Sequence, residues 1–124
     1  MTEQNDPTAT QYVVLIYERM SPNWPDDIPP EVAQANEDVD AKIEARGGRI
    51  LAGVALGPAS TATSIRGGAI TDGPFIETKE GLAGLFLLEA RDLDHAIELA
   101  RLTPIADGGV EVRPLLGFMI PEPS

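Results

Sequence analysis

The chain alternates between short, continuously apolar segments and longer segments in which apolar residues recur at helical spacing. Gln11–Glu18 and Leu82–Ala90 carry apolar residues on both sides of an extended chain, so both are predicted to be strands with two covered faces. Arg49–Leu56 and Val110–Leu116 are further strand candidates, the latter because apolar and charged residues alternate at its start. A sheet built from these strands needs material packed on each side.

Two segments have the apolar spacing of amphipathic helices, Glu31–Arg46 and Leu93–Thr103. Gly47 can end the first helix in the left-handed conformation, and Asp92 is predicted to cap the second. The predicted buried stripes consist of Val32, Ala35, Val39 and Ile43 in the first helix, and of Leu93, Ala96, Ile97 and Ala100 in the second. Each helix is therefore expected to cover the sheet with one face.

A tight, charged bend joins a weakly apolar hairpin to the second of the long apolar strands. The hairpin is predicted over Ala62–Arg66 and Ala69–Thr71, with two glycines at its turn. Asp72-Gly73-Pro74 then forces the chain to turn, because glycine permits positive φ and proline fixes its own φ. Two interpretations remain open. Asp72 caps its own bend while Phe75 plugs the edge of the core, or Asp72 faces a pocket as a general base or ligand acceptor.

The order strand, helix, strand, hairpin, strand, helix, strand predicts an α+β fold, the ferredoxin-like split βαβ plan with an inserted hairpin. Residues 11–117 are expected to form one domain, between a disordered lead-in at residues 1–10 and a tail at 118–124. Two helices cover only one face of such a sheet, and each large apolar side chain left in water costs about 1.5–3 kcal/mol. We therefore predict a homodimer that pairs the uncovered faces, with a pocket between that face and the connecting loops.

Composition and charge exclude several classes of function. The 124 residues include 9 Lys and Arg, 20 Asp and Glu and no cysteine, giving a net charge of −11. The negative charge argues against nucleic-acid binding and against docking on anionic membranes. Without cysteine there is no disulfide and no thiolate chemistry. The sequence has no apolar run of membrane-spanning length and begins with a polar segment, so a cytoplasmic location is expected by default.

No cofactor or metal is predicted. The glycine pairs open no helix with phosphate-loop spacing, and a metal site would need more His or Cys ligands than this chain offers. His95 is the only histidine and lies beside Asp94 and Glu98 on the second predicted helix, so we expect it on the solvated surface.

Several residues near the predicted pocket are candidates for ligand binding. By strand alternation Arg113 and Glu111 point to the uncovered face, either as an ion pair across the dimer interface or with Arg113 as a clamp for a carboxylate. Glu18 and Arg19, at the end of the first strand, are predicted to line the same cleft, and Tyr17 is a further candidate for ligand binding. Trp24 lies in a proline-rich loop, where it is either an anchor over the core edge or a ligand platform.

Several stretches of this chain resemble a known family: YVVLIYE, GPASTATSIR, TDGPFIETKEGLAGLFLLEARDLDHAIELA and GGVEVRPL. Together these stretches, which run from Gln11 to about Leu116, resemble the YCII-related proteins, in particular the subgroup named after its Asp-Gly-Pro-Phe motif. The resemblance implies a dimeric α+β barrel of ferredoxin-like subunits and, for some members, a link to extracytoplasmic-function sigma factors. YCII-type members are thought to use a His–Asp pair in the cleft, and the matching region here, around Asn36 and Glu37, has no histidine.

Two functions of different classes follow. The first is a small cofactor-independent enzyme or binding protein for a carboxylated metabolite, with Asp72 as base and Arg113 as clamp. The second is a non-catalytic regulatory partner, as the link to sigma factors implies.

Overall fold

The computed structural model describes residues 10–21, 23–117, 119 and 121. Its elements are β1 (Thr10–Glu18), α1 (Pro30–Ala45), β2 (Arg49–Ala55), a 3-10 turn (Ala59–Thr61), β3 (Thr63–Arg66), β4 (Ala69–Asp72), β5 (Gly81–Ala90), α2 (Leu93–Ala100) and β6 (Gly108–Pro114). This is the predicted order of elements. Residues 1–9 of the predicted lead-in and most of the predicted tail lie outside the described residues, while Thr10 already belongs to β1.

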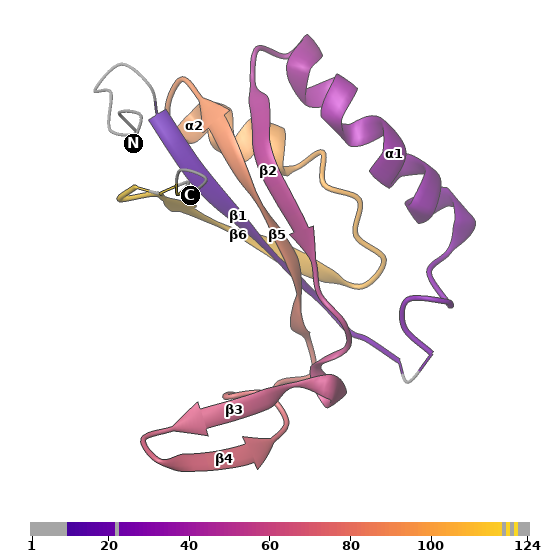
Figure 1. Cartoon of the computed structure of the whole chain (residues 1–124). Coiled ribbons are helices and arrows are strands. Elements are labelled where there is room, and N and C mark those ends of the chain that lie inside the picture. The colour runs from indigo at the N-terminus through magenta and orange to yellow at the C-terminus, as the bar shows by residue number, and fades with distance from the viewer. Residues whose placement is uncertain (1–9, 22, 118, 120, 122–124) are drawn as a thin grey trace.

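Four strands form one antiparallel sheet in the order β2-β5-β1-β6 (Figure 1). The two central strands are β5 and β1, the two most apolar segments of the sequence. Both helices lie on one face of this sheet, and the order is that of the split βαβ plan of ferredoxin-like α+β proteins. The predicted ferredoxin-like α+β fold of the single chain is therefore confirmed, and its pairing into a dimeric barrel stays a prediction.

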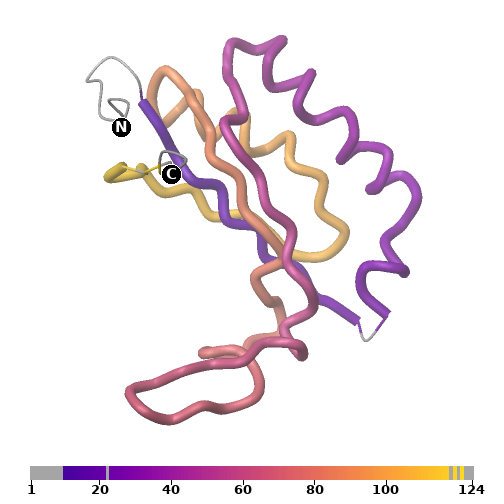
Figure 2. The backbone as a smooth tube through the Cα atoms, in the orientation of Figure 1, coloured from indigo at the N-terminus to yellow at the C-terminus, as the bar shows by residue number. Residues whose placement is uncertain are grey.

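The inserted hairpin does not join the main sheet. Strands β3 and β4 pair only with each other and project as an arm beyond the end of the four-stranded sheet (Figure 2). Gly67, at φ +60°, makes the turn of this arm, in accord with the predicted glycine turn. We refer to Thr63–Asp72 as the arm.

The core lies between the sheet and the two helices. Its buried members are Tyr12, Val14, Ile43, Phe86, Leu88, Ala90, Ala96, Leu99 and Ala100. Helix α1 ends as predicted, with Gly47 at φ +85°. The Gly47 and Gly48 N–H groups donate to the carbonyls of Glu44 and Ile43 at 3.0 and 3.1 Å, which satisfies the end of the helix.

The opposite side of the sheet, the helix-free face, is also apolar. Side chains alternate along a strand, so the neighbours of buried Tyr12 and Val14 point away from the helices. Two rows of paired residues cross this face, Glu111–Leu15–Leu85–Val54 and Arg113–Val13–Leu87–Ala52. The prediction of strands that are apolar on both sides is confirmed, and none of the described helices or strands covers this face.

Helix α2 differs from its prediction in length and in its buried face. It ends at Ala100 rather than Thr103, and Leu93 and Ile97 are exposed. His95 and Leu99 take buried positions instead, so the face that packs is rotated away from the predicted stripe. Asp92 caps the helix as predicted, since its Oδ1 accepts the His95 N–H at 2.8 Å.

Candidate functional site

A cavity of about 630 Å³ lies where the arm leaves the main sheet. Its walls include Tyr17, Leu56, Pro74, Phe75, Ile76 and Leu82. Tyr17 on β1 is paired with Leu82 on β5, so the cavity begins at the end of the helix-free face. It continues along the segment that follows the aspartate bend. We call it the bend cavity.

The aspartate bend is held by the backbone and by Ser64 rather than by its aspartate. Gly73 has φ +98°, as the predicted turn requires. The Gly73 N–H donates to the Ala62 carbonyl at 2.7 Å, and Ser64 Oγ donates to the Gly73 carbonyl at 2.6 Å. Within the part of the chain that the structure describes, the Asp72 carboxylate takes part in no hydrogen bond or ion pair. The interpretation that Asp72 caps its own bend is therefore wrong. Asp72 is exposed and is not among the residues that line the bend cavity, although Pro74, two positions further along the chain, is.

Phe75 does not plug the core. Its residue surface is 58% exposed, and its ring forms part of the cavity wall. The Arg66 guanidinium carbon lies 4.2 Å from the centroid of this ring, in cation–π geometry. The interpretation of Phe75 as a core residue is wrong because the bend directs it toward the arm, and the contact brings a positive charge beside the cavity.

Arg113 lies on the helix-free face, as the alternation predicted, but away from the bend. Its Nε contacts Glu111 Oε2 two residues back on the same strand, so these two charges already pair within one chain, and a pairing across an interface stays a prediction. This carboxylate raises the pKa of the Arg113 guanidinium, which stays charged. Arg113 pairs with Val13, about 13 Å along β1 from Tyr17 at about 3.3 Å per residue. One subunit therefore does not bring Arg113 and Asp72 together.

Glu18 and Trp24 belong to a different cavity. This second space, of about 450 Å³, lies on the helix side of the sheet and is lined by Ile16, Glu18, Trp24, Val32, Asn36 and Phe86, among others. We call it the helix-side cavity. Tyr17 and Glu18 are neighbours on β1, so their side chains point to opposite faces. The ligand-binding candidates Tyr17 and Glu18 therefore do not share a cleft, and Arg19, predicted to line the same cleft as Glu18, lines neither cavity.

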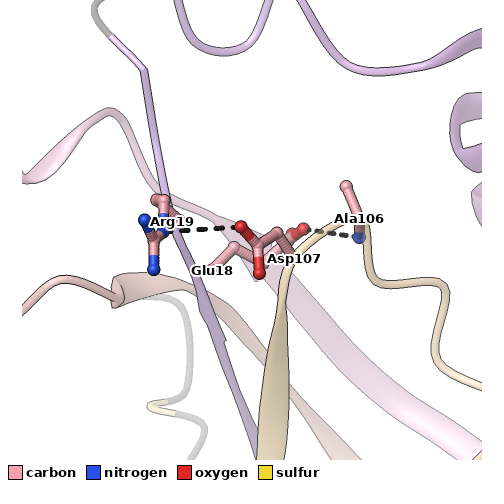
Figure 3. A network of polar contacts seen from close by, with 4 residues as sticks. All are labelled: Glu18, Arg19, Ala106 and Asp107. Atoms are coloured by element: carbon pink, nitrogen blue, oxygen red, sulfur yellow. Dashed lines mark hydrogen bonds and ion pairs between the residues drawn. The ribbon is translucent and has the colours of Figure 1, made fainter.

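The Glu18 carboxylate is buried, with 6% of the residue exposed. Its Oε1 accepts the Ala106 N–H at 3.0 Å, and the two residues face one another in Figure 3. The adjacent Arg19 is directed to Asp107. Its backbone N–H donates to the Asp107 carbonyl at 2.8 Å, and its Nε lies 3.4 Å from Oδ2 of the same residue. Glu18 thus anchors the loop that leads into β6 while its charge remains in the cavity wall.

His95 is buried, with 2% exposed, which contradicts the surface position expected for it. Its Nδ1 accepts a hydrogen bond from the Arg91 backbone N–H at 3.0 Å, which places the ring proton on Nε2. Nε2 in turn donates to the Arg46 carbonyl oxygen, 2.8 Å away. Both ring nitrogens serve the backbone, so His95 joins the start of α2 to the end of α1 and offers no free nitrogen for acid–base catalysis. Local sequence pattern carries no signal for this role, because one partner lies 49 residues away.

Among the described residues, no group of three or more His, Asp or Glu side chains is arranged to hold a metal ion. In the same part of the chain, no helix is long and apolar enough to cross a bilayer.

The chain thus folds as an α+β protein of ferredoxin-like topology, and predicted site residues lie at two cavities, the bend cavity and the helix-side cavity. A model of the YCII-related domain matches residues 10–119, and the chain belongs to this family. The chain is also 35% identical over 114 residues to an uncharacterised protein of Rhizobium meliloti (strain 1021), in an alignment that covers 84% of this chain and 90% of the relative. The family identified from the sequence is confirmed, and its Asp-Gly-Pro-Phe subgroup remains a prediction.

Proposed function

We propose that this YCII-related protein is a cytoplasmic homodimer that binds a small carboxylated metabolite in the bend cavity. The observation that carries the proposal is the cavity itself, whose volume of about 630 Å³ is in the range of small-molecule sites. Its walls are largely apolar, with Thr78 and Glu80 among the few polar residues. Such a space suits a ligand with an apolar body and one charged end.

Arg66 supplies the positive charge for the carboxylate. Its guanidinium is held against the ring of Phe75, which lines the cavity. The planar fork of arginine suits a carboxylate, and stacking on a ring leaves its N–H groups free to donate. Arg113 was predicted for this role, but its guanidinium is engaged by Glu111. In the proposal Arg66 is therefore the clamp within the subunit.

A second copy would complete the site. Tyr17 and Leu82 lie both at the cavity and at the end of the helix-free face, so a subunit that covers this face would also close the open side of the cavity. The half-buried leucines and valines along the face support such pairing. Asp72 remains the candidate base, because it is exposed and precedes Pro74 of the cavity wall by two positions.

Calorimetric titration with 3-phenylpropionate tests the proposal, with 3-phenylpropan-1-ol as the uncharged probe of the same shape. We expect the wild-type protein to bind the acid at least tenfold more tightly than the alcohol. The variants Arg66→Gln and Phe75→Ala should lose this preference, while Arg101→Gln, which removes an exposed arginine at the end of α2, should keep it. Equal binding of acid and alcohol, or full binding by Arg66→Gln, contradicts the proposed site.

The variant Asp72→Asn then tests the aspartate. A direct role in the site predicts altered ligand affinity with an unchanged assembly state and unfolding midpoint. Unchanged affinity would remove Asp72 from the site.

One observation favours the second function, a regulatory protein that binds an extracytoplasmic-function sigma factor. Ile65 and Ile70 are paired across the arm and are 66% and 70% exposed, and contiguous exposed apolar residues mark protein interaction surfaces. In this case the double variant Ile65→Ser, Ile70→Ser should abolish co-purification with the sigma factor, and Arg66→Gln should not. An unaffected complex would exclude the arm as the binding surface.

A further inference from the structure

We propose that the helix-side cavity is a second ligand site, which binds a small organic cation of the primary-amine class through Glu18. The wall of this cavity is apolar except for two side chains, the carboxylate of Glu18 and the amide of Asn36. The cavity holds about 450 Å³, enough for an amine with a short hydrocarbon body. It lies on the other side of the sheet from the bend cavity and does not depend on the function proposed there.

The charge of Glu18 is not balanced by the protein. The residue is 6% exposed, and its Oε1 accepts one backbone N–H, from Ala106. Arg19, the cation next to it in sequence, is directed to Asp107 instead (Figure 3). Across residues 10–21 and 23–117, no Lys, Arg or His forms an ion pair with Glu18. A buried carboxylate without a cation is costly, and a bound ammonium group would offset that cost.

Glu18 lines the cavity, and its hydrogen bond with Ala106 uses Oε1. The one fully buried side-chain polar atom without a partner in the described chain is Thr103 Oγ1, so Glu18 Oε2 is not sealed inside the protein. It accepts no hydrogen bond from the described residues. An ammonium N–H that enters the cavity can therefore donate to it, while Oε1 continues to hold Ala106.

The other walls of the cavity also suit a cation. Trp24 offers the indole ring, which is the aromatic face that attracts ammonium groups most strongly. The Asn36 side-chain oxygen is a further acceptor for an N–H group. Anionic ligands are disfavoured by Glu18 and by the net charge of −11, which raises the local concentration of cations. The site thus selects a charge opposite to that of the ligand proposed for the bend cavity.

Trp24 is the only tryptophan, so its fluorescence reports on this cavity. Titration of the full chain with hexylammonium, 1-hexanol and hexanoate separates the effect of the charged group from that of the hydrocarbon chain, because the three probes share a six-carbon chain and differ in charge. We expect a saturable change with hexylammonium, at least tenfold weaker binding of hexanol and no binding of hexanoate. Binding of hexanol as tight as that of the ammonium, or no saturable change with the ammonium, overturns the proposal without recourse to a variant.

The variant Glu18→Gln retains an oxygen for the Ala106 N–H but removes the charge. We expect its affinity for hexylammonium to fall at least tenfold, while its urea midpoint stays near that of the wild type. Glu98→Gln makes the same change of charge on the exposed side of α2 and should bind as the wild type does. Wild-type affinity in Glu18→Gln overturns the proposal.

Asp27 is the alternative anion, because it lies with Trp24 beside an adjoining cavity. If Asp27→Asn, rather than Glu18→Gln, abolishes the fluorescence change, the amine binds in that neighbouring space and the assignment to Glu18 is wrong. Arg66→Gln should leave hexylammonium binding unchanged, so a failure of this site and a failure of the bend cavity are distinguishable.

Discussion

His95 shows how one buried side chain links two helices. The variant His95→Ala removes the hydrogen bonds to the Arg91 N–H and the Arg46 carbonyl and leaves a small void. We expect the free energy of unfolding to fall by about 2–4 kcal/mol, because unpaired polar groups and lost packing add. Urea denaturation followed by circular dichroism measures this change.

Matched variants separate the two hydrogen bonds. His95→Asn places an oxygen near the position of Nδ1 and should recover part of the loss through Arg91, whereas Glu98→Ala on the same helix should change stability by less than about 0.5 kcal/mol. A His95→Ala midpoint equal to that of Glu98→Ala would show that the buried network contributes nothing to stability.

Single residues were the least predictable part of this chain. The separation of Tyr17 from Glu18 follows from strand alternation and was open to prediction from the sequence. The distance between Arg113 and the bend was not, because it depends on the register of β6 against β1. Likewise, the burial of His95 depends on a carbonyl at the end of another helix.

At the scale of elements, two glycines in the β2–β5 pair differ in the space that is available for a side chain. A β-carbon on Gly84 would lie 2.5 Å from the Val54 carbonyl oxygen, whereas one on Gly53 would have its nearest neighbour at 3.7 Å. We expect Gly84→Ala to lower the free energy of unfolding by about 1–3 kcal/mol, because two backbones must move apart.

Gly53→Ala is the matched control in the partner strand. It should leave stability unchanged or raise it by up to about 1 kcal/mol, because alanine restricts the unfolded chain. Thermal unfolding of the two variants under the same conditions measures the difference in stability. An equal loss of stability in both would mean that the sheet tolerates the close approach at Gly84.

Elements with local signals were predictable, and those set by distant partners were not. Gly47 and Asp92 mark a helix end and a helix start from the neighbouring residues alone, and both appear in the structure. The weak hydrophobicity of the arm is typical of a peripheral segment, but no local pattern predicted that it would form a sheet of its own. The prediction of the buried face of α2 was wrong because packing against β5 and β6 decides how the helix is rotated about its axis.

At the scale of the whole molecule, hydrophobic pattern was sufficient to predict the fold. The two segments that are apolar on both sides became the two central strands, which have a neighbouring strand at each edge and the helices on one face. The pattern could not place the site, because four of the predicted candidates divide between two cavities, Tyr17 and Phe75 in one and Glu18 and Trp24 in the other, while Asp72 and Arg113 line neither. To predict that division, one would need to know the path of the arm as well as the order of the strands.

The helix-free face provides the last prediction, which concerns assembly. Leu87 lies at its centre, paired with Val13 and Ala52, and a charge there would have to be desolvated if a second copy covered the face. We expect the wild type to sediment as a dimer at micromolar concentration and Leu87→Arg to sediment as a monomer. Ile97→Arg, which places the same charge on the exposed side of α2, should remain a dimer. A wild-type monomer at this concentration would rule out the pairing of the two sheets and leave the bend cavity open on the side that the second copy was proposed to close.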